Sequence, residues 1–126
     1  MTALLVRHFQ QSFQGFEFPQ FLIYQTGDFH VPHRDVAENS QVSDYVRERK
    51  ISAVLFLNRA GESLDDSSFA GGALTLYGLL DNSRSKKYGF PIIAEEGLLV
   101  AFNANLVHEV TPVTHGARYS IVSYYF

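Results

Sequence analysis

Apolar residues recur along most of the chain in short runs that are separated by Gly, Pro, Asn, Asp and Ser. Runs of this length, bounded by turn-forming residues, predict β-strands. The run at 51–58 is almost continuously apolar, which is typical of a strand buried on both faces. We therefore expect a mainly β chain whose short strands form a sandwich or a barrel, with strands at 18–26, 51–58, 73–77, 90–97, 98–102, 106–111 and 117–126.

Helical periodicity is restricted to the first residues. Over 1–17, a spacing of three and four predicts an amphipathic helix from Leu4, Leu5, His8, Phe9, Phe13 and Phe16. The polar stretch 36–50 predicts either a short helix after Asp44 or a loop, and 59–70 and 81–88 predict loops. At most one or two short helices are therefore expected, near the N-terminus and in 36–50.

The composition narrows the classes of protein that this chain can represent. Its 126 residues fit one domain, 1–126, with 46% hydrophobic and 14% aromatic residues. The formal charge of −3 shows no excess of basic residues of the kind that binds nucleic acid or an anionic membrane, so we expect neither as a partner. There is no Cys, so any metal must use N and O ligands. Neither a signal pattern nor a membrane-length apolar run is found, and we expect a cytoplasmic protein.

Two imidazoles and a carboxylate form the candidate metal site. His33 and Asp35 are two positions apart, so on a strand both point to the same side. With His108 as the second imidazole, they form the ligand set expected of a non-haem Fe(II) oxygenase. His30 lies at an odd offset from His33, which predicts the opposite face of the strand. We therefore expect His33, and not His30, to be the ligand.

Further motifs extend this pattern over most of the chain. From about Phe21 to Phe126 the sequence resembles the Fe(II)/2-oxoglutarate dioxygenases of the prolyl 4-hydroxylase type. The resemblance implies a double-stranded β-helix, or jelly roll, with iron inside one open end. Its pieces, in the order of that family, are Tyr24 with Gly27-Asp28-Phe29-His30, His33-Arg34-Asp35, Arg49 through Leu57-Asn58, Gly71-Gly72-Ala73-Leu74, Gly97 through Phe102, and His108-Glu109 with Gly116-Ala117-Arg118.

The resemblance also implies roles for individual residues. His33, Asp35 and His108 match the Fe(II) ligands, and three adjacent positions stay free for 2-oxoglutarate and O2. Arg118 matches the residue that binds the distal carboxylate of 2-oxoglutarate, in agreement with the bidentate grip of a guanidinium on a carboxylate. Tyr24 matches a Tyr whose hydroxyl reaches the co-substrate.

Four positions determine how closely the site of this chain matches the site of that family. Phe56 stands where some relatives have a Tyr that shares the 2-oxoglutarate carboxylate, which leaves either Tyr24 as the only phenol there or a shifted co-substrate. His30, Arg49 and Tyr124 fall where relatives meet substrate. Relatives often have Tyr in place of His30 and an indole in place of Tyr124. We therefore do not expect the substrate to be fixed by the resemblance.

The expected activity is hydroxylation of a C–H bond, with succinate and CO2 as co-products. A prolyl residue in a protein or peptide is the first acceptor that the resemblance implies, and a free amino acid or other small molecule is the alternative. A mouth rimmed by 81–88 would favour a peptide, and a closed pocket would favour a small molecule. A cupin-like binding module is the non-enzymatic alternative. Homodimerisation is a further expectation, because few N-terminal residues precede the core to cover the sheet.

Overall fold

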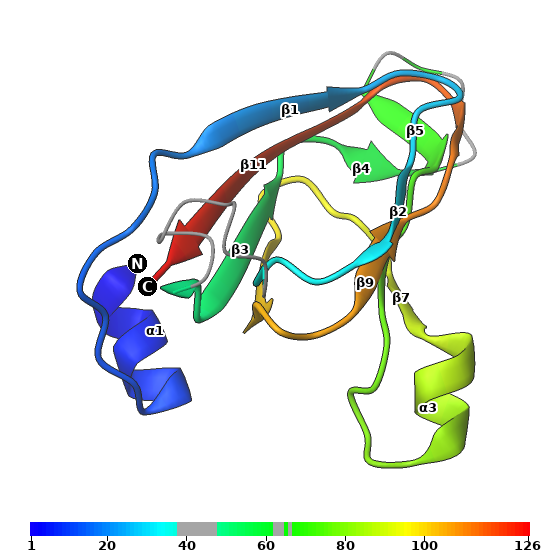
Figure 1. Ribbon diagram of the computed structural model, residues 1–126. Helices are drawn as coiled ribbons and strands as arrows, with labels where there is room; N and C mark the ends of the chain where they lie inside the picture. The colour runs from blue at the N-terminus through cyan, green and yellow to red at the C-terminus, as the bar shows by residue number, and fades with distance from the viewer. Residues whose placement is uncertain (38–47, 62–64, 66) are drawn as a thin grey trace.

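The computed structural model describes residues 1–37, 48–61, 65 and 67–126. The described strands form two facing four-stranded sheets and a three-stranded sheet, the expected jelly roll (Figure 1). The first sheet has the order β1 (Gln20–Tyr24), β11 (Arg118–Tyr125), β3 (Ile51–Phe56) and β8 (Leu99–Asn103). The second has the order β2 (His30–His33), β9 (His108–Val110), β6 (Leu74–Leu76) and β7 (Phe90–Ile92). The third comprises β10 (Val113–His115), β5 (Ser68–Gly71) and β4 (Arg59–Ala60).

Strand β3 is buried on both faces, as its apolar run predicts. Its inner face contributes Val54 and Phe56 to the core between the two four-stranded sheets. Its outer face contributes Ile51 and Ala53 to a second cluster with Leu5 of helix α1 (Thr2–Phe9). Helix α1 therefore covers part of the outer face of the first sheet, and the inner face is left to line the site.

The N-terminal helix is shorter than its sequence periodicity predicts. Helix α1 spans Thr2–Phe9 and ends at Gln10, whose φ of 53° is left-handed. Phe13 continues the apolar spacing, yet it packs on Tyr125 from a non-helical segment, with a ring distance of 5.6 Å. The helical spacing beyond Phe9 therefore reflects packing against the sheet. None of the described helices is long and apolar enough to cross a membrane.

Regular structure also occupies both stretches for which loops are predicted. Within 59–70 lie β4 and most of β5, which pair in parallel. Within 81–88 lies helix α3, Ser83–Tyr88, which projects from the sheets beside β7 (Figure 1). The helical turn expected after Asp44 falls largely outside the described residues, so that prediction remains untested.

A side-chain cap explains why α3 forms without a buried residue. The Asn82 side chain accepts a hydrogen bond from the Ser85 backbone N–H at 2.7 Å, which satisfies a donor of the first turn. Gly89 ends the helix at φ 70°, and its N–H donates to the Ser85 carbonyl. Local hydrogen bonds, which apolar periodicity does not reveal, define this helix.

Candidate metal centre and co-substrate pocket

Three predicted ligands converge at one end of the space between the sheets. His33 ends β2 and His108 begins β9, and the two are direct cross-strand partners. Asp35 follows β2, and its backbone N–H donates to the carbonyl of Ala104 at 2.9 Å. The His33 and His108 Nε2 atoms lie 3.3 Å from the two carboxylate oxygens of Asp35. One ligand atom from each residue lies within 4.8 Å of the others.

Backbone carbonyls orient both imidazole rings. His33 Nδ1 lies 2.7 Å from the carbonyl oxygen of Val31, and His108 Nδ1 lies 2.8 Å from that of Leu106. These contacts hold Nδ1 on the outer side of each ring and turn Nε2 toward Asp35, where Nε2 donates to the carboxylate when protonated and can bind a metal when it is not. Two imidazoles and one carboxylate, all aimed at one point, fit Fe(II).

Ser52 holds the carboxylate of the centre. Its fully buried hydroxyl donates to Asp35 Oδ2 at 2.5 Å. Burial by itself would raise the pKa of Asp35, but hydrogen bonds from His108, His33 and Ser52 outweigh it and hold that pKa well below its usual range. Ser52 was not among the site residues predicted from the sequence. Its signal was a polar residue inside the most apolar strand of the chain.

Strand register places Arg118 at the other end of the same interior. Positions 118, 120, 122 and 124 of β11 face inward, and Tyr124 pairs with Ser52 at the metal end. Arg118 Nη1 donates to the Ser120 hydroxyl at 3.1 Å, so the guanidinium reaches toward the metal centre. At about 3.3 Å per residue, Ser120 and Tyr124 are roughly 13 Å apart along the strand.

The Arg118 guanidinium is a buried cation that lacks an anionic partner in the part of the chain that the structure describes. Its residue is 2% exposed, and Nε makes no hydrogen bond among the described residues. Tyr24 and Phe56 place their ring centroids 5.1 Å from the guanidinium carbon. Burial lowers the pKa of Arg118, but an arginine stays charged at any working pH. A buried charge of this kind is stabilised by a bound anion, and a carboxylate fits its free Nε.

A cavity of about 250 Å³ joins Arg118 to the metal centre. Tyr24 lies beside Arg118, whereas Gln20, His30 and Tyr124 line the metal side. Gln20 and His30 are exposed, so the cavity opens to solvent there. Its walls are apolar and come from both sheets: Leu22, Val54, Leu74, Phe102, Val110 and Val122.

The expected position of His30 is wrong. Its ring stacks on that of His33, with centroids 3.8 Å apart and planes 15° apart, so both histidines face the cavity. His30 pairs with Val110 and His33 with His108, so three steps on β2 oppose two on β9. This bulge adds a residue and cancels the odd offset. Burial, and then the charge of His33, lower the pKa of His30.

Arg49 and Tyr124 form one stacked unit beside the ligands. Arg49 binds Glu17 through two hydrogen bonds, Nε–Oε2 at 2.5 Å and Nη2–Oε1 at 2.7 Å. Its guanidinium lies 3.7 Å from the Tyr124 ring centroid, and Nη1 donates to the Asp35 carbonyl at 3.3 Å. Arg49 therefore supports the wall, while Tyr124 lines the cavity. Burial, and then Asp35, raise the pKa of Tyr124 to about 12.

The jelly roll and the two-histidine, one-carboxylate centre define the non-haem iron class of site. Residues 19–126 match the family model of the 2OG-Fe(II) oxygenase superfamily, and the chain belongs to that superfamily. Fe(II) is the cofactor of this superfamily, and 2-oxoglutarate and O2 are its co-substrates. No curated protein matches the chain significantly.

Solved structures agree with this assignment. A Pseudomonas putida prolyl-4-hydroxylase is 25% identical over 98% of this chain and 59% of its own, with a TM-score of 0.68. An oxidoreductase of the 2OG-Fe(II) oxygenase family from Burkholderia pseudomallei is 20% identical over 98% and 49%, with a TM-score of 0.71. A prolyl hydroxylase from Trichoplax adhaerens is 23% identical over 90% and 45%, with a TM-score of 0.65. The chain thus spans about half the length of these proteins and is similar in fold to the prolyl-4-hydroxylase from Pseudomonas putida.

Proposed function

We propose that this protein is an Fe(II)- and 2-oxoglutarate-dependent oxygenase that hydroxylates a prolyl residue of a protein or peptide, with succinate and CO2 as co-products. The observation that carries the proposal is the buried guanidinium of Arg118, which has no carboxylate partner among the described residues and faces the three-ligand centre across an apolar cavity. A cupin-like module that binds metal alone has no need of this cation. The family match also favours the oxygenase.

The side chains of the site divide between binding the metal and binding the co-substrate. His33, Asp35 and His108 hold Fe(II), and Arg118 binds the distal carboxylate of 2-oxoglutarate. The bound metal, with 2-oxoglutarate and O2, supplies the oxidation that no side chain can perform. Tyr24 serves as a neutral donor, because burial raises the pKa of its phenol. The apolar walls keep water away from the reacting atoms.

The peptide acceptor is supported by the open side of the cavity. Gln20 and His30 are exposed there, so an extended chain can pass beside the metal centre. The Trichoplax adhaerens relative was solved in complex with a hypoxia inducible factor peptide fragment. A free amino acid or other small molecule is the alternative acceptor. The cytoplasmic location stays a prediction, as does the homodimer, which sedimentation at micromolar concentration would test.

Anaerobic titration with Fe(II) and then 2-oxoglutarate tests the co-substrate site directly. A chelated keto acid gives a visible charge-transfer band, which we expect for the wild-type protein. Arg118→Ala should weaken the affinity for 2-oxoglutarate by about 100-fold, because a charge-assisted bidentate contact is lost. Arg59→Ala, which removes an exposed arginine paired with Asp65, is the matched control. Metal binding without a band in the wild type would refute the oxygenase and favour the binding module.

A further inference from the structure

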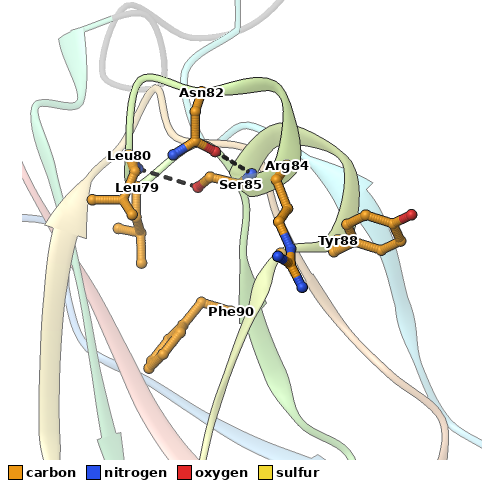
Figure 2. A pocket seen from close by; sticks show the side chains of 8 residues that line it. Leu79, Leu80, Asn82, Arg84, Ser85, Tyr88 and Phe90 are labelled. Carbon is orange, nitrogen blue, oxygen red and sulfur yellow. Dashed lines mark hydrogen bonds between the residues drawn. The ribbon is translucent and has the colours of Figure 1, made fainter.

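A second cavity, of about 600 Å³, lies outside the metal centre (Figure 2). We call it the α3 groove and define it by Leu79, Leu80, Arg84, Tyr88 and Phe90. Figure 2 shows the two leucines and Arg84 directed toward the side on which Phe90 lies. The four large apolar side chains are between 48% and 66% exposed. The groove is thus an open apolar surface beside a helix that is otherwise polar.

Hydrogen bonds hold the groove in shape. The Leu80 N–H donates to the Ser85 hydroxyl at 3.1 Å, and the Gly78 N–H donates to the Ser85 carbonyl at 3.1 Å. The Asn82 cap fixes the first turn of α3 on the same serine (Figure 2). These bonds join the segment before α3 to the helix itself. The backbone that carries Leu79 and Leu80 therefore needs little ordering when a ligand binds.

The groove lies two strands away from the metal ligand His108, in the same sheet. Phe90 pairs with Leu76, and Leu76 pairs with His108. Directly paired residues share a face of a sheet, so Phe90 lies on the face that carries the metal ligand. Two strand spacings separate Phe90 from His108, about 10 Å. An extended chain covers this distance in about three residues. A polypeptide whose reacting residue sits at the metal therefore reaches the groove with a near neighbour.

The rim of the groove favours an anion. Helix α3 carries Arg84, Lys86 and Lys87 within a chain of net charge −3. Lys86 pairs with exposed Asp81 at 3.4 Å, and such surface pairs contribute little. Arg84 lines the groove, and no carboxylate of the described residues pairs with it. A ligand with an acidic group beside its apolar side chain complements this rim.

We propose that the α3 groove binds a flanking segment of the substrate polypeptide, an apolar side chain followed by a carboxylate, about three to five residues from the reacting residue. The inference rests on the proposed function and deepens it, because a free amino acid cannot occupy both places. Leu80 and Phe90 contact the apolar side chain of the substrate, and Arg84 pairs with its carboxylate.

A binding experiment without any prolyl residue isolates the groove from the metal centre. The probe is a fluorescein-labelled Gly-Ser peptide with a central Leu-Leu-Glu-Glu, compared with the same peptide carrying Ala-Ala-Lys-Lys. By fluorescence anisotropy, we expect the wild-type protein to bind the first at least tenfold more tightly, which corresponds to about 1.4 kcal/mol. Leu80→Ser and Arg84→Glu should each abolish most of this preference.

Matched controls come from helix α1. Leu4 is 61% exposed and Leu80 is 65% exposed, so Leu4→Ser removes a comparable side chain elsewhere. Arg7→Glu reverses a charge on α1 as Arg84→Glu does on α3. Both controls should keep the preference of the wild type. Equal affinity for the two peptides, or a preference that survives Leu80→Ser and Arg84→Glu in folded protein, would overturn the proposal. A dimer that Leu80→Ser dissociates, with peptide binding unchanged, would assign the groove to a second copy instead.

A second measurement connects the groove to turnover. Prolyl peptides that carry Leu-Glu at two to seven residues from the proline are compared by succinate formation. We expect KM to be lowest at three to five residues and to rise about tenfold in Leu80→Ser, with the 2-oxoglutarate charge-transfer band unchanged. No dependence on the Leu-Glu spacing would also count against the groove. Absence of the band in the wild type, with probe binding intact, would refute the oxygenase and leave the groove standing.

Discussion

Replacing Ser52 by Ala removes a hydroxyl that touches the metal centre only through Asp35. Ser52 is fully buried, and its hydroxyl donates to Asp35 Oδ2 at 2.5 Å. This hydrogen bond restricts rotation of the Asp35 carboxylate, which therefore keeps one orientation before metal binds. The alanine variant retains all three ligands and loses only this restraint. It therefore separates the orientation of the carboxylate from its presence.

The expected magnitude follows from the chemistry of that bond. A hydrogen bond to a charged group contributes roughly 1.5–3 kcal/mol. Because 1.4 kcal/mol is a factor of ten, Ser52→Ala should weaken metal binding by about 10- to 100-fold. The pKa of Asp35 should rise as well, because one of the hydrogen bonds that lower it is lost while its burial remains. The loss of affinity should therefore grow as pH falls.

Anaerobic calorimetric titration with Fe(II), repeated with Mn(II), measures the effect without requiring turnover. Ser123→Ala is the matched control, because Ser123 is 4% exposed on the neighbouring strand β11 and donates instead to the carbonyl of Glu17 at 3.2 Å. It loses a buried serine hydrogen bond away from the ligands. Metal affinity within twofold of wild type in Ser52→Ala, or an equal loss in Ser123→Ala, would refute the orienting role of Ser52.

Three further changes give measurable outcomes. Arg118→Lys should keep metal binding but lower the affinity for 2-oxoglutarate at least tenfold in the anaerobic band titration, since an ammonium cannot form the bidentate contact. Gly72→Ala should cost about 1–3 kcal/mol in denaturant unfolding, because φ is +58° and a Cβ would lie 2.9 Å from the Val113 side chain and 3.2 Å from Arg118 Cδ. The raised pKa of Tyr124 keeps a neutral phenol in the folded state, so its contribution is complete below pH 10 and is lost as pH rises to about 12. Tyr124→Phe should flatten the fall of unfolding free energy with pH in this window, and Tyr88→Phe, which removes an exposed phenol, should leave it unchanged.

Most strands of the two four-stranded sheets and the metal ligands were predictable because their signals are local. The apolar run of β3 required burial on both faces, and the structure provides it through the core and α1. The two-residue spacing of His33 and Asp35 and the motif around His108 identified the ligand set. Arg118 was indicated by its place in the family pattern, and its burial with no acid partner among the described residues supplies the physical reason.

The features that escaped prediction depend on pairing between distant segments or on single hydrogen bonds. His30 faces the cavity because of a bulge, whose existence depends on the register of β2 against β9. Helix α3 has no buried residue, so apolar periodicity could not reveal it, and the Asn82 cap is a weak local signal. The role of Ser52 requires knowing that Asp35 lies over β3. Sequence spacing carries none of this information.

Strand β11 gives the site its length. It carries Arg118 at one end and Tyr124 at the other, and its pairing with β3 places Tyr124 opposite Ser52, which holds Asp35. A slip of one residue would turn Arg118 to the outer face of the sheet and leave the cavity without its cation. The separation between the metal centre and Arg118 is therefore fixed by hydrogen-bonded register in the middle of a sheet. Loops can vary the substrate around such a site, whereas the strand ladder keeps the cation and the metal at one distance.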